Sequence, residues 1–449
     1  MLANTGTTKA ATELPRKLGL LDSISIVSGT MIGAGIFIVP ASIARELPSA
    51  TAILAVWVVA GIISFFGALA YAELGAMLPQ SGGQYVYLRE AYGPLTAFLC
   101  GWAAFLIIQS GSIATVAVGL GIYATYLFPD TPGLRWAPAV AIMIFTFINY
   151  RGVKAGARTQ NIFTLLKVSG LALLISSAFL YRGPVALEWD SPASVLSLRS
   201  VAIAMLGCFL AYDGWQYIAF VAGEVRNPQR NLPIALAVGT GIVIVLYLLA
   251  NLAYMRVLPL SQIASTERVA AAVSEYTMGS GGAALVALTI MLSCAGAANG
   301  AILSSPRIYF AQARDGLFFQ RFAEIHPRFQ TPAFSILVQG IWSMILTLTG
   351  SYETLLSYVL FAMWLFHAMA VFGVVILRRK NGNLPRPYRM WGYPVAPLLF
   401  TAFALAFVIN TFISRPVPSL LGALIIASGI PTYWLWRRQA RRRPLAGCA

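Results

Sequence analysis

The stretch that decides the fold is Ser-Gly-Thr-Met-Ile-Gly-Ala-Gly-Ile-Phe at residues 28–37, inside the first apolar run of the chain. A second stretch, Ala-Tyr-Asp-Gly-Trp at residues 211–215, lies in the sixth apolar run. Glycine clusters of this kind also occur where helices pack closely. Two clusters at corresponding positions, one of them with an acidic residue, favour two membrane helices broken at mid-depth. The pattern predicts an inverted repeat with halves at 22–181 and 199–377.

The composition requires a lipid environment. Of the 449 residues, 58% are hydrophobic and only 10% are charged, whereas a soluble domain carries about 25% charged residues. A membrane helix needs about 20 apolar residues, and the chain is therefore expected to be an all-α membrane protein with twelve spans. A segment 1–21 precedes the span region 22–436, two extra helices lie at 395–436, and a basic tail follows at 437–449. The expected spans are 22–47, 51–78, 95–127, 136–150, 160–181, 199–221, 233–256, 282–305, 332–350, 354–377, 395–414 and 417–436.

The positive charge follows the topology. The net charge is +16, which in a soluble protein would suggest nucleic acid. Of the 31 Lys and Arg residues, 23 fall on the side of the termini, 7 fall on the opposite side and Lys167 lies within a span. Since loops rich in Lys and Arg stay in the cytoplasm, both termini are expected to be cytoplasmic, and no nucleic-acid partner is expected.

A break at residues 33–35 exposes backbone groups that an intact helix hides. Free N–H groups at the start of the second half-helix attract a carboxylate, and free carbonyl groups at the end of the first attract an ammonium. An α-amino acid carries both groups, so the break predicts a site for a zwitterion. Asp213, at the second break, either binds a cationic group or caps freed backbone N–H groups, and the sequence leaves both roles open.

Few other residues suggest chemistry. Ionisable residues inside spans cost about 2.5–3.5 kcal/mol each on insertion scales. Glu73 is expected to form a gate or structural ion pair, and Lys167 is given no role. Cys100, Cys208 and Cys294 are interpreted as core residues. No metal site, cofactor or catalytic motif is expected, so the chain is not expected to be an enzyme.

In their order and spacing, several motifs resemble those of the L-type amino acid transporters of the amino acid–polyamine–organocation (APC) superfamily. They are also similar to those of the bacterial serine/threonine and alanine-serine-cysteine exchangers. The resemblance covers most of the chain. The motifs are Gly-Thr-Met-Ile-Gly-Ala-Gly-Ile-Phe at 29–37, Ala-Glu-Leu-Gly at 72–75, Ser-Gly-Gly-Gln-Tyr at 81–85, Gly-Val-Lys-Ala at 152–155, Ala-Tyr-Asp-Gly-Trp at 211–215, Gly-Glu-Val-Arg-Asn-Pro-Gln-Arg-Asn-Leu-Pro at 223–233 and Ser-Pro-Arg-Ile-Tyr-Phe-Ala at 305–311.

The resemblance implies a LeuT-type fold, alternating access and sodium-independent exchange. Leu210 takes the position of the family's gating aromatic residue, a departure that weakens the case for a gate there. Small residues such as Ala34 and Ala301 imply room for a small or medium substrate side chain. The implied substrate-binding residues are Met31, Ile32, Gly33, Ala34, Gly35, Ile108, Ser112, Leu210, Ala211, Asp213, Gly214, Cys294, Ala297 and Asn299.

The same resemblance gives Lys154 a role. Sodium-coupled carriers of this fold place an ion between the first and eighth spans, and in sodium-independent relatives a lysine of the fifth span takes that place. Lys154 is implied to be this lysine, with the carbonyl groups of 29–33 and the Ser293 hydroxyl as partners. From its position alone, Lys154 would be interpreted as a positive anchor.

Human light subunits of this family are disulfide-bonded to a single-span glycoprotein through a cysteine between the third and fourth spans. Thr131 occupies that position here, so no disulfide-linked ancillary subunit is expected at it. This fits a stand-alone protein of a cell membrane, with the bacterial inner membrane as the expected location.

Three functions remain open. The leading one is a sodium-independent antiporter for small or medium neutral L-amino acids. The first alternative is a proton-coupled or basic amino acid/polyamine transporter of the same fold. The second is an amino acid sensor that does not transport.

Overall fold

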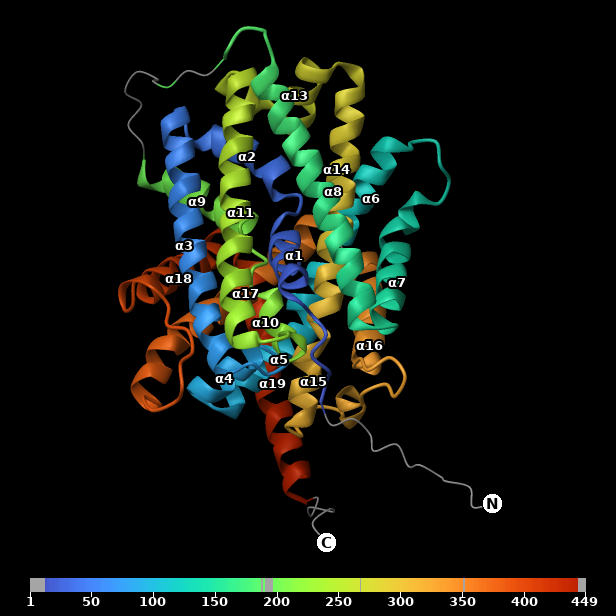
Figure 1. The fold of residues 1–449 in the computed structure, drawn as a ribbon, viewed down its shortest axis with the longest axis vertical. Helices are drawn as coiled ribbons and strands as arrows, with labels where there is room; N and C mark the ends of the chain where they lie inside the picture. Colours follow the sequence, from blue (N-terminus) through green and yellow to red (C-terminus); the bar gives the residue numbers. More distant parts are fainter. Residues whose placement is uncertain (1–12, 187–188, 190–196, 267, 350–351, 443–449) are drawn as a thin grey trace.

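The computed structural model describes residues 13–186, 189, 197–266, 268–349 and 352–442. Its ordered elements are helices, which run mostly along the long axis of the molecule (Figure 1). The elements of the first half are α1 (Leu20–Met31), α2 (Gly35–Glu46), α3 (Ala50–Met77), α4 (Gln84–Tyr92), α5 (Pro94–Ala103), η1 (Ala104–Ile108), α6 (Gln109–Leu127), η2 (Leu134–Trp136), α7 (Ala137–Tyr150) and α8 (Val153–Leu180).

The second half begins with another interrupted helix, and two helices are appended after it. Its elements are α9 (Leu198–Ala211), α10 (Tyr217–Phe220), η3 (Ala222–Glu224), α11 (Pro228–Val257), α12 (Leu260–Ser265), α13 (Val269–Met278), α14 (Ser280–Ser304), α15 (Pro306–Arg314), η4 (Gln320–Ala323), α16 (Ala333–Thr349) and α17 (Tyr352–Lys380). The appended helices are α18 (Val395–Ser414) and α19 (Pro416–Arg442).

Among the described residues, nine helices or helix pairs are long and apolar enough to cross a membrane. Three shorter apolar helices, at Leu134–Tyr150, Leu198–Ala211 and Ala333–Thr349, coincide with the fourth, sixth and ninth expected spans. The all-α membrane fold is thereby confirmed. The fifth span begins at Val153 instead of residue 160, which matters for the site below.

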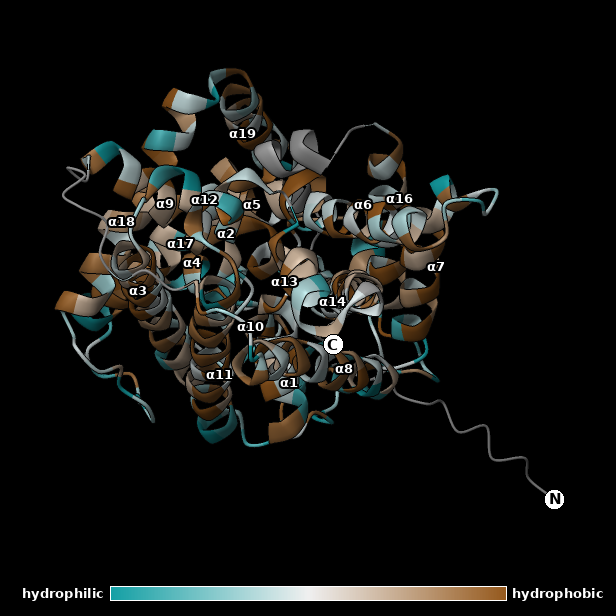
Figure 2. Cartoon of the chain, turned by 90° about the horizontal axis from the view of Figure 1, so that it is seen from above, coloured by the Kyte–Doolittle hydropathy of each residue, from teal (hydrophilic) through white to brown (hydrophobic). Residues whose placement is uncertain are grey.

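The distribution of side chains on α8 shows the membrane character directly. Its polar residues Gln160, Thr164 and Lys167 are buried, although polar residues of a soluble helix face outward. On the same helix, Ile162 and Leu165 are 59% and 67% exposed. The apolar face is turned outward, as a lipid solvent requires. In Figure 2, hydrophobic colour likewise covers helices at the edge of the bundle, such as α3 and α7.

The helix starts follow local chain chemistry. Ser49 caps α3, and its side chain accepts from the N–H of Ala52. Pro94 and Pro228 begin α5 and α11, where the missing proline N–H costs nothing. In front of them, Gly93 and Asn227 adopt positive φ angles of 100° and 45°, which turn the chain into the helix.

Both described chain ends lie at the same end of the molecule, the lower one in Figure 1, which we call the terminal end. There, Leu18 N–H donates to Glu224 O at 2.9 Å, and Arg226 N–H donates to Leu18 O at 2.8 Å. The side chains of Glu224 and Arg307 form an ion pair of 2.6 Å and are fully buried. These contacts tie the chain start, the segment after α10 and α15 together.

A second set of contacts at the terminal end surrounds α4. Arg89 Nη1 lies 2.7 Å from Asp315 Oδ2, and the Tyr85 hydroxyl donates to the same oxygen at 2.8 Å. Burial and the Asp315 carboxylate raise the pKa of Tyr85 well above its usual value, so the phenol stays a donor. Glu73 accepts from Arg378 and from the Met390 N–H, which confirms the ion pair expected for this residue.

Candidate functional site

The first break lies between α1 and α2. Met31 ends α1, Ile32 to Ala34 leave the helix, and Gly35 begins α2. The last carbonyl group of α1 is hydrogen-bonded, because the Tyr247 hydroxyl donates to Met31 O at 3.0 Å. At the start of α2, the Phe37 N–H donates to Ala34 O at 3.1 Å, whereas the N–H groups of Gly35 and Ile36 lack an intrahelical acceptor. The break expected at residues 33–35 is thus present.

The second break faces the first. α9 ends at Ala211, and residues 212–216 form turns before α10. The Thr30 hydroxyl donates to Gly214 O at 2.8 Å. Gly214 has φ +123°, and a Cβ there would lie 2.7 Å from the Thr30 carbonyl carbon. Only glycine suits both the backbone angle and this close approach.

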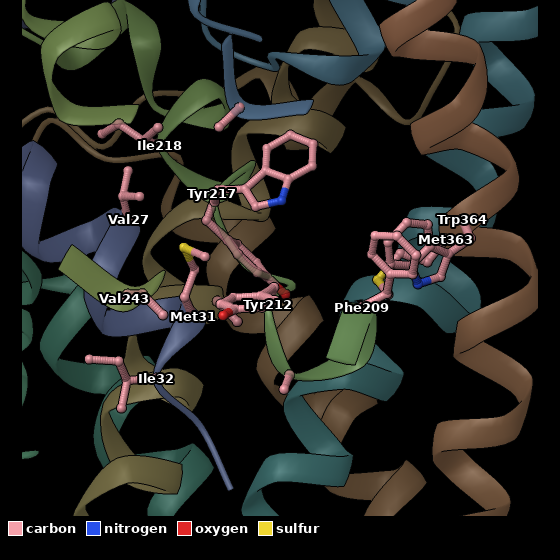
Figure 3. Packing of buried hydrophobic residues seen from close by; sticks show 14 of the residues in the cluster. Val27, Met31, Ile32, Phe209, Tyr212, Tyr217, Ile218, Val243, Met363 and Trp364 are labelled. Atoms are coloured by element: carbon pink, nitrogen blue, oxygen red, sulfur yellow. The ribbon is translucent and has the colours of Figure 1, made fainter. Parts of the chain in front are cut away.

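Small residues also bring the two breaks together on their other side. A Cβ added to Gly35 would lie 3.0 Å from the Ala211 Cα, so the start of α2 touches the end of α9. Figure 3 shows Met31, Tyr212 and Tyr217 at this junction, and Phe209, Met363 and Trp364 grouped on the side of α17.

Free space adjoins the first break. A Cβ on Gly33 would meet no atom within 4 Å. Gly33 and Gly35 are partly exposed, although Met31 and Ile32 beside them are buried at 2% and 0%. Asp213 is also partly exposed, with 17% of its side-chain surface accessible. Accessible surface beside otherwise buried residues therefore coincides with the unwound backbone of both breaks.

The charges of the helix ends complement an amino acid zwitterion. The N-terminus of α2 carries a partial positive charge that favours a carboxylate. The last carbonyl groups of α9, up to Ala211, carry a partial negative charge and lack intrahelical donors, except for Cys208 O, which accepts from the Tyr212 N–H. Since Gly35 and Ala211 touch, the N-terminus of α2 and the C-terminus of α9 lie close together. They can bind the carboxylate and the ammonium of one amino acid, which share a single α-carbon.

A buried lysine stabilises the first break, and it is Lys167, not Lys154. Lys167 Nζ donates to Gly29 O at 2.7 Å, Ile32 O at 2.8 Å and Ser293 O at 3.0 Å. These three acceptors match the three donors of an ammonium. Ser293 also lies where expected, but its hydroxyl donates to Ile32 O at 3.0 Å.

The contacts expected for Lys154 are therefore wrong. Its Nζ pairs with Asp22 Oδ2 at 2.6 Å, and its side chain is 41% exposed. α8 begins at Val153, so Lys154 lies in the first turn, about 20 Å along the helix from Lys167 at 1.5 Å per residue. Lys154 cannot reach the break, and its pairing is that of an anchor near the helix end.

Asp213 does not act as a backbone cap in this structure. Its carboxylate accepts from Gln216 Nε2, at 3.3 Å to each oxygen, and lies 3.2 Å from His367 Nε2. The Gly214 N–H is bonded by Gln216 Oε1 at 3.1 Å instead. Gln216, His367 and Tyr247 belong to the surroundings of the breaks but were not expected from the sequence.

The third span contributes Ile108 and Ser112. Ile108 ends η1, a π-helical turn of the kind often found at functional sites. Ser112 is partly exposed and interacts with Tyr217, which follows the second break. Their part in lining a substrate site stays a prediction. Leu210 is partly buried in the last turn of α9.

On α14, the eighth expected span, one of the three predicted substrate-lining residues has other contacts. Cys294 and Ala297 are buried and remain candidates. The Asn299 amide is directed elsewhere: its Nδ2 donates to Gln160 Oε1 at 2.9 Å, and its Oδ1 accepts from Asn149 at 3.0 Å. Asn299 therefore connects α14 to α8 and α7, and its assignment to the substrate lining is corrected.

The remaining expectations concern covalent and metal chemistry. Within the described part of the chain, Cys100, Cys208 and Cys294 are free and buried, as core residues are. Over the same residues, no group of three metal-ligating side chains is found. Thr131 lies in an exposed turn between α6 and η2, and its N–H donates to Phe128 O.

Comparison with known proteins gives a consistent result. The amino acid permease family model matches residues 18–436. The human b(0,+)-type amino acid transporter 1 is 33% identical over 95% of this chain and 88% of its own length. The mouse large neutral amino acids transporter small subunit 2 is 33% identical over 94% of the chain and 81% of its own length.

A third relative extends the range of substrates named among these proteins. The human cystine/glutamate transporter is 32% identical over 96% of this chain and 87% of its own length. The motif resemblance noted in the sequence is confirmed, as is the expectation that the chain is not an enzyme. With a family match over residues 18–436 and relatives above 30% identity over 94–95% of the chain, this protein belongs to the amino acid permease family of the APC superfamily.

Proposed function

We propose that this chain exchanges small or medium neutral L-amino acids across a membrane by alternating access, without sodium. The observation that carries the proposal is the open space at Gly33, set between the start of α2 and the end of α9. The substrate carboxylate binds the N–H groups of α2, and its ammonium binds the last carbonyl groups of α9. Lipid surrounds the bundle, so the freed backbone groups beside this space are where a zwitterion is stable.

The independence from sodium rests on Lys167. Its ammonium bonds carbonyl groups of α1 and α14, so a fixed charge takes the place of a transported cation. A fixed charge cannot leave with the substrate, and transport then requires no ion gradient at this position.

The substrate side chain extends from the breaks toward α6 and α14. Ser112, Cys294 and Ala297 are small, which supports small or medium substrates. The relatives' names include large neutral amino acids and cystine/glutamate, so family membership alone does not choose the side chain. A cationic substrate is the second candidate, because the partly exposed Asp213 carboxylate lies at the second break.

The cellular setting is part of the proposal. The protein works in a cell membrane, with the bacterial inner membrane as our assignment, and the terminal end faces the cytoplasm. Thr131 leaves no thiol for a disulfide-linked subunit at that position, which supports a carrier that functions alone.

Counterflow in proteoliposomes tests the function. Liposomes preloaded with unlabelled alanine, serine, threonine or cysteine should accumulate the labelled amino acid, equally well when choline replaces sodium. Absence of counterflow for every amino acid, combined with a thermal shift on amino acid binding, would favour a sensor. Uptake into liposomes that contain no amino acid, driven by a pH gradient, would favour a proton-coupled carrier.

A glycine pair tests the site. Gly33→Ala fills the free space without a steric clash, because nothing lies within 4 Å of its added Cβ. Exchange should fall at least about tenfold, the effect of roughly 1.4 kcal/mol of lost substrate binding, while the melting temperature stays unchanged. Gly281→Ala on α14 also meets no atom within 4 Å and serves as the control with normal exchange. Equal activity of both variants would contradict the placement of the substrate.

A further inference from the structure

His367 forms a buried polar chain beside the proposed site. It lies on α17 and is 1% exposed. Its Nε2 is 3.2 Å from Asp213 Oδ1, and its Nδ1 is 3.2 Å from Gln84 Nε2 on α4. The chain Gln84–His367–Asp213 therefore joins three separate parts of the fold at the carboxylate that a cationic substrate would need.

The positions of hydrogen-bond donors and acceptors define the resting state of the Gln84–His367–Asp213 chain. A carboxylate only accepts, so His367 Nε2 carries the proton and donates it to Asp213. Gln84 presents its amide nitrogen to His367 Nδ1, and an imidazole that accepts at Nδ1 and donates at Nε2 satisfies both neighbours. A second proton on Nδ1 would face the Gln84 NH2 group and requires this amide to turn its oxygen inward. Protonation of His367 Nδ1 is therefore possible once the Gln84 amide has turned over.

Among the described residues, Tyr71 on α3 is a titratable neighbour of His367 besides Asp213, with ring centroids 6.5 Å apart. Tyr87 on α4 and Cys100 on α5 lie next to Tyr71. Tyr217 also faces Asp213. Tyrosine and cysteine are ordinarily neutral below about pH 8.

The helices that pack against α17 carry few further charges, and on α4 Arg89 pairs with Glu90 and with Asp315. η1, α6 and α18 contain no Asp, Glu, Lys, Arg or His. The arginines of α19 lie at its terminal end. Glu73 on α3 is already paired with Arg378. Asp213 is therefore the acidic partner of His367 among the described residues.

We propose that His367 is a specificity-determining residue that decides whether Asp213 accepts cationic amino acids. This inference rests on the proposed transport function and goes beyond it. With His367 neutral, the Asp213 carboxylate keeps its negative charge and pairs with a guanidinium or ammonium of the substrate side chain. With His367 protonated, the imidazolium neutralises Asp213 internally and excludes a second cation. Neutral substrates bind in either state.

The inference predicts a pH-dependent preference. Histidine side chains change charge between about pH 5 and 8, and protonation removes the site's net negative charge. Acidic pH should therefore weaken arginine binding without weakening serine binding. The readout is the ratio of the half-inhibitory concentrations of arginine and serine against counterflow of labelled alanine, or of the neutral amino acid with the largest counterflow. In the wild type this ratio should fall about tenfold from pH 5.5 to pH 7.5, which corresponds to roughly 1.4 kcal/mol of arginine binding.

The chain offers a matched control, because His326 is its only other histidine. His326 lies in the loop after η4 and contacts Phe329 and Tyr150, away from Asp213. His367→Asn, and His367→Gln as a second replacement, should make the arginine-to-serine ratio independent of pH. His326→Asn should keep the wild-type pH dependence. Monodisperse elution of each purified variant confirms that it folds.

The outcomes separate this inference from the proposed function. Unchanged pH dependence in both His367 variants would overturn the inference while transport stands. So would an equal effect of pH on arginine and serine, or a failure of arginine to compete at any pH in wild type and variants. Absence of counterflow with every neutral amino acid would reject the proposed function itself, and the inference with it.

Discussion

Lys167 carries its charge in a place where the membrane offers no water. Its ammonium reaches three backbone carbonyl groups, those of Gly29 on α1, Ile32 in the first break and Ser293 on α14. Replacing it with methionine keeps the length of the side chain and removes all three donors. Each buried carbonyl left without a partner costs about 1–3 kcal/mol. We expect Lys167→Met to lower the melting temperature and to abolish exchange in proteoliposomes.

Lys154 provides the matched comparison on the same helix. Its pair with Asp22 is partly exposed, and such pairs contribute at most about 1 kcal/mol. Lys154→Met should retain at least half of wild-type exchange. If Lys154→Met were inactive and Lys167→Met active, the lysine that stabilises the break would be misidentified.

Lys167 has the contacts that were expected for Lys154, and this difference shows what can and cannot be predicted from the sequence. The motif Gly-Val-Lys-Ala drew attention to Lys154, but the break is bonded from a residue about 20 Å further along α8. A signal was available, since Lys167 is the single Lys or Arg in the interior of an expected span, away from its ends, and such residues are functional candidates by default. His367 and Gln84 gave no comparable signal, because their contact joins helices almost 300 residues apart in sequence.

At the scale of helices, the two breaks were predictable because glycine clusters at corresponding positions of two halves, one of them with an acidic residue, are typical of interrupted membrane helices. The all-apolar spans were predictable from length. The start of α8 was not predictable, because Lys154 and Arg158 are charged residues typical of loops. Only the structure shows that they belong to the helix. The π-helical turn η1 lies in a featureless apolar run, so its position depends on packing and not on local sequence.

The contact between the breaks predicts different tolerance at different glycines. Gly214 has φ +123°, and an added Cβ would approach Thr30 within 2.7 Å. Gly214→Ala should therefore lose both stability and exchange, with a cost of about 1–3 kcal/mol for the backbone strain alone. Gly241→Ala on α11 meets no atom within 4 Å and should be at least as stable as the wild type. Melting curves of the purified variants check this, and equal curves for both would show that the second break relaxes freely.

At the scale of the molecule, the terminal end is closed by fully buried charges. Glu224 and Arg307 are 0% exposed and 2.6 Å apart. Arg307→Met leaves a buried carboxylate without a partner, which costs about 3–5 kcal/mol. The double variant Glu224→Gln/Arg307→Met removes both charges and should recover part of that loss. A double variant less stable than Arg307→Met in thermal unfolding would show that the charges do not act as a pair.

The orientation of the whole molecule gives the last prediction. Both described chain ends lie at the terminal end, as an even number of spans requires. The loops on that side hold 23 of the 31 Lys and Arg residues, and positively charged loops are retained in the cytoplasm. Tags fused to either terminus should react with an impermeant reagent only after the cytoplasmic side is opened, while a cysteine placed at Thr131 should react from outside. Opposite accessibility of the two tags would require an odd number of spans, and the two breaks could then not occupy equivalent positions in inverted halves.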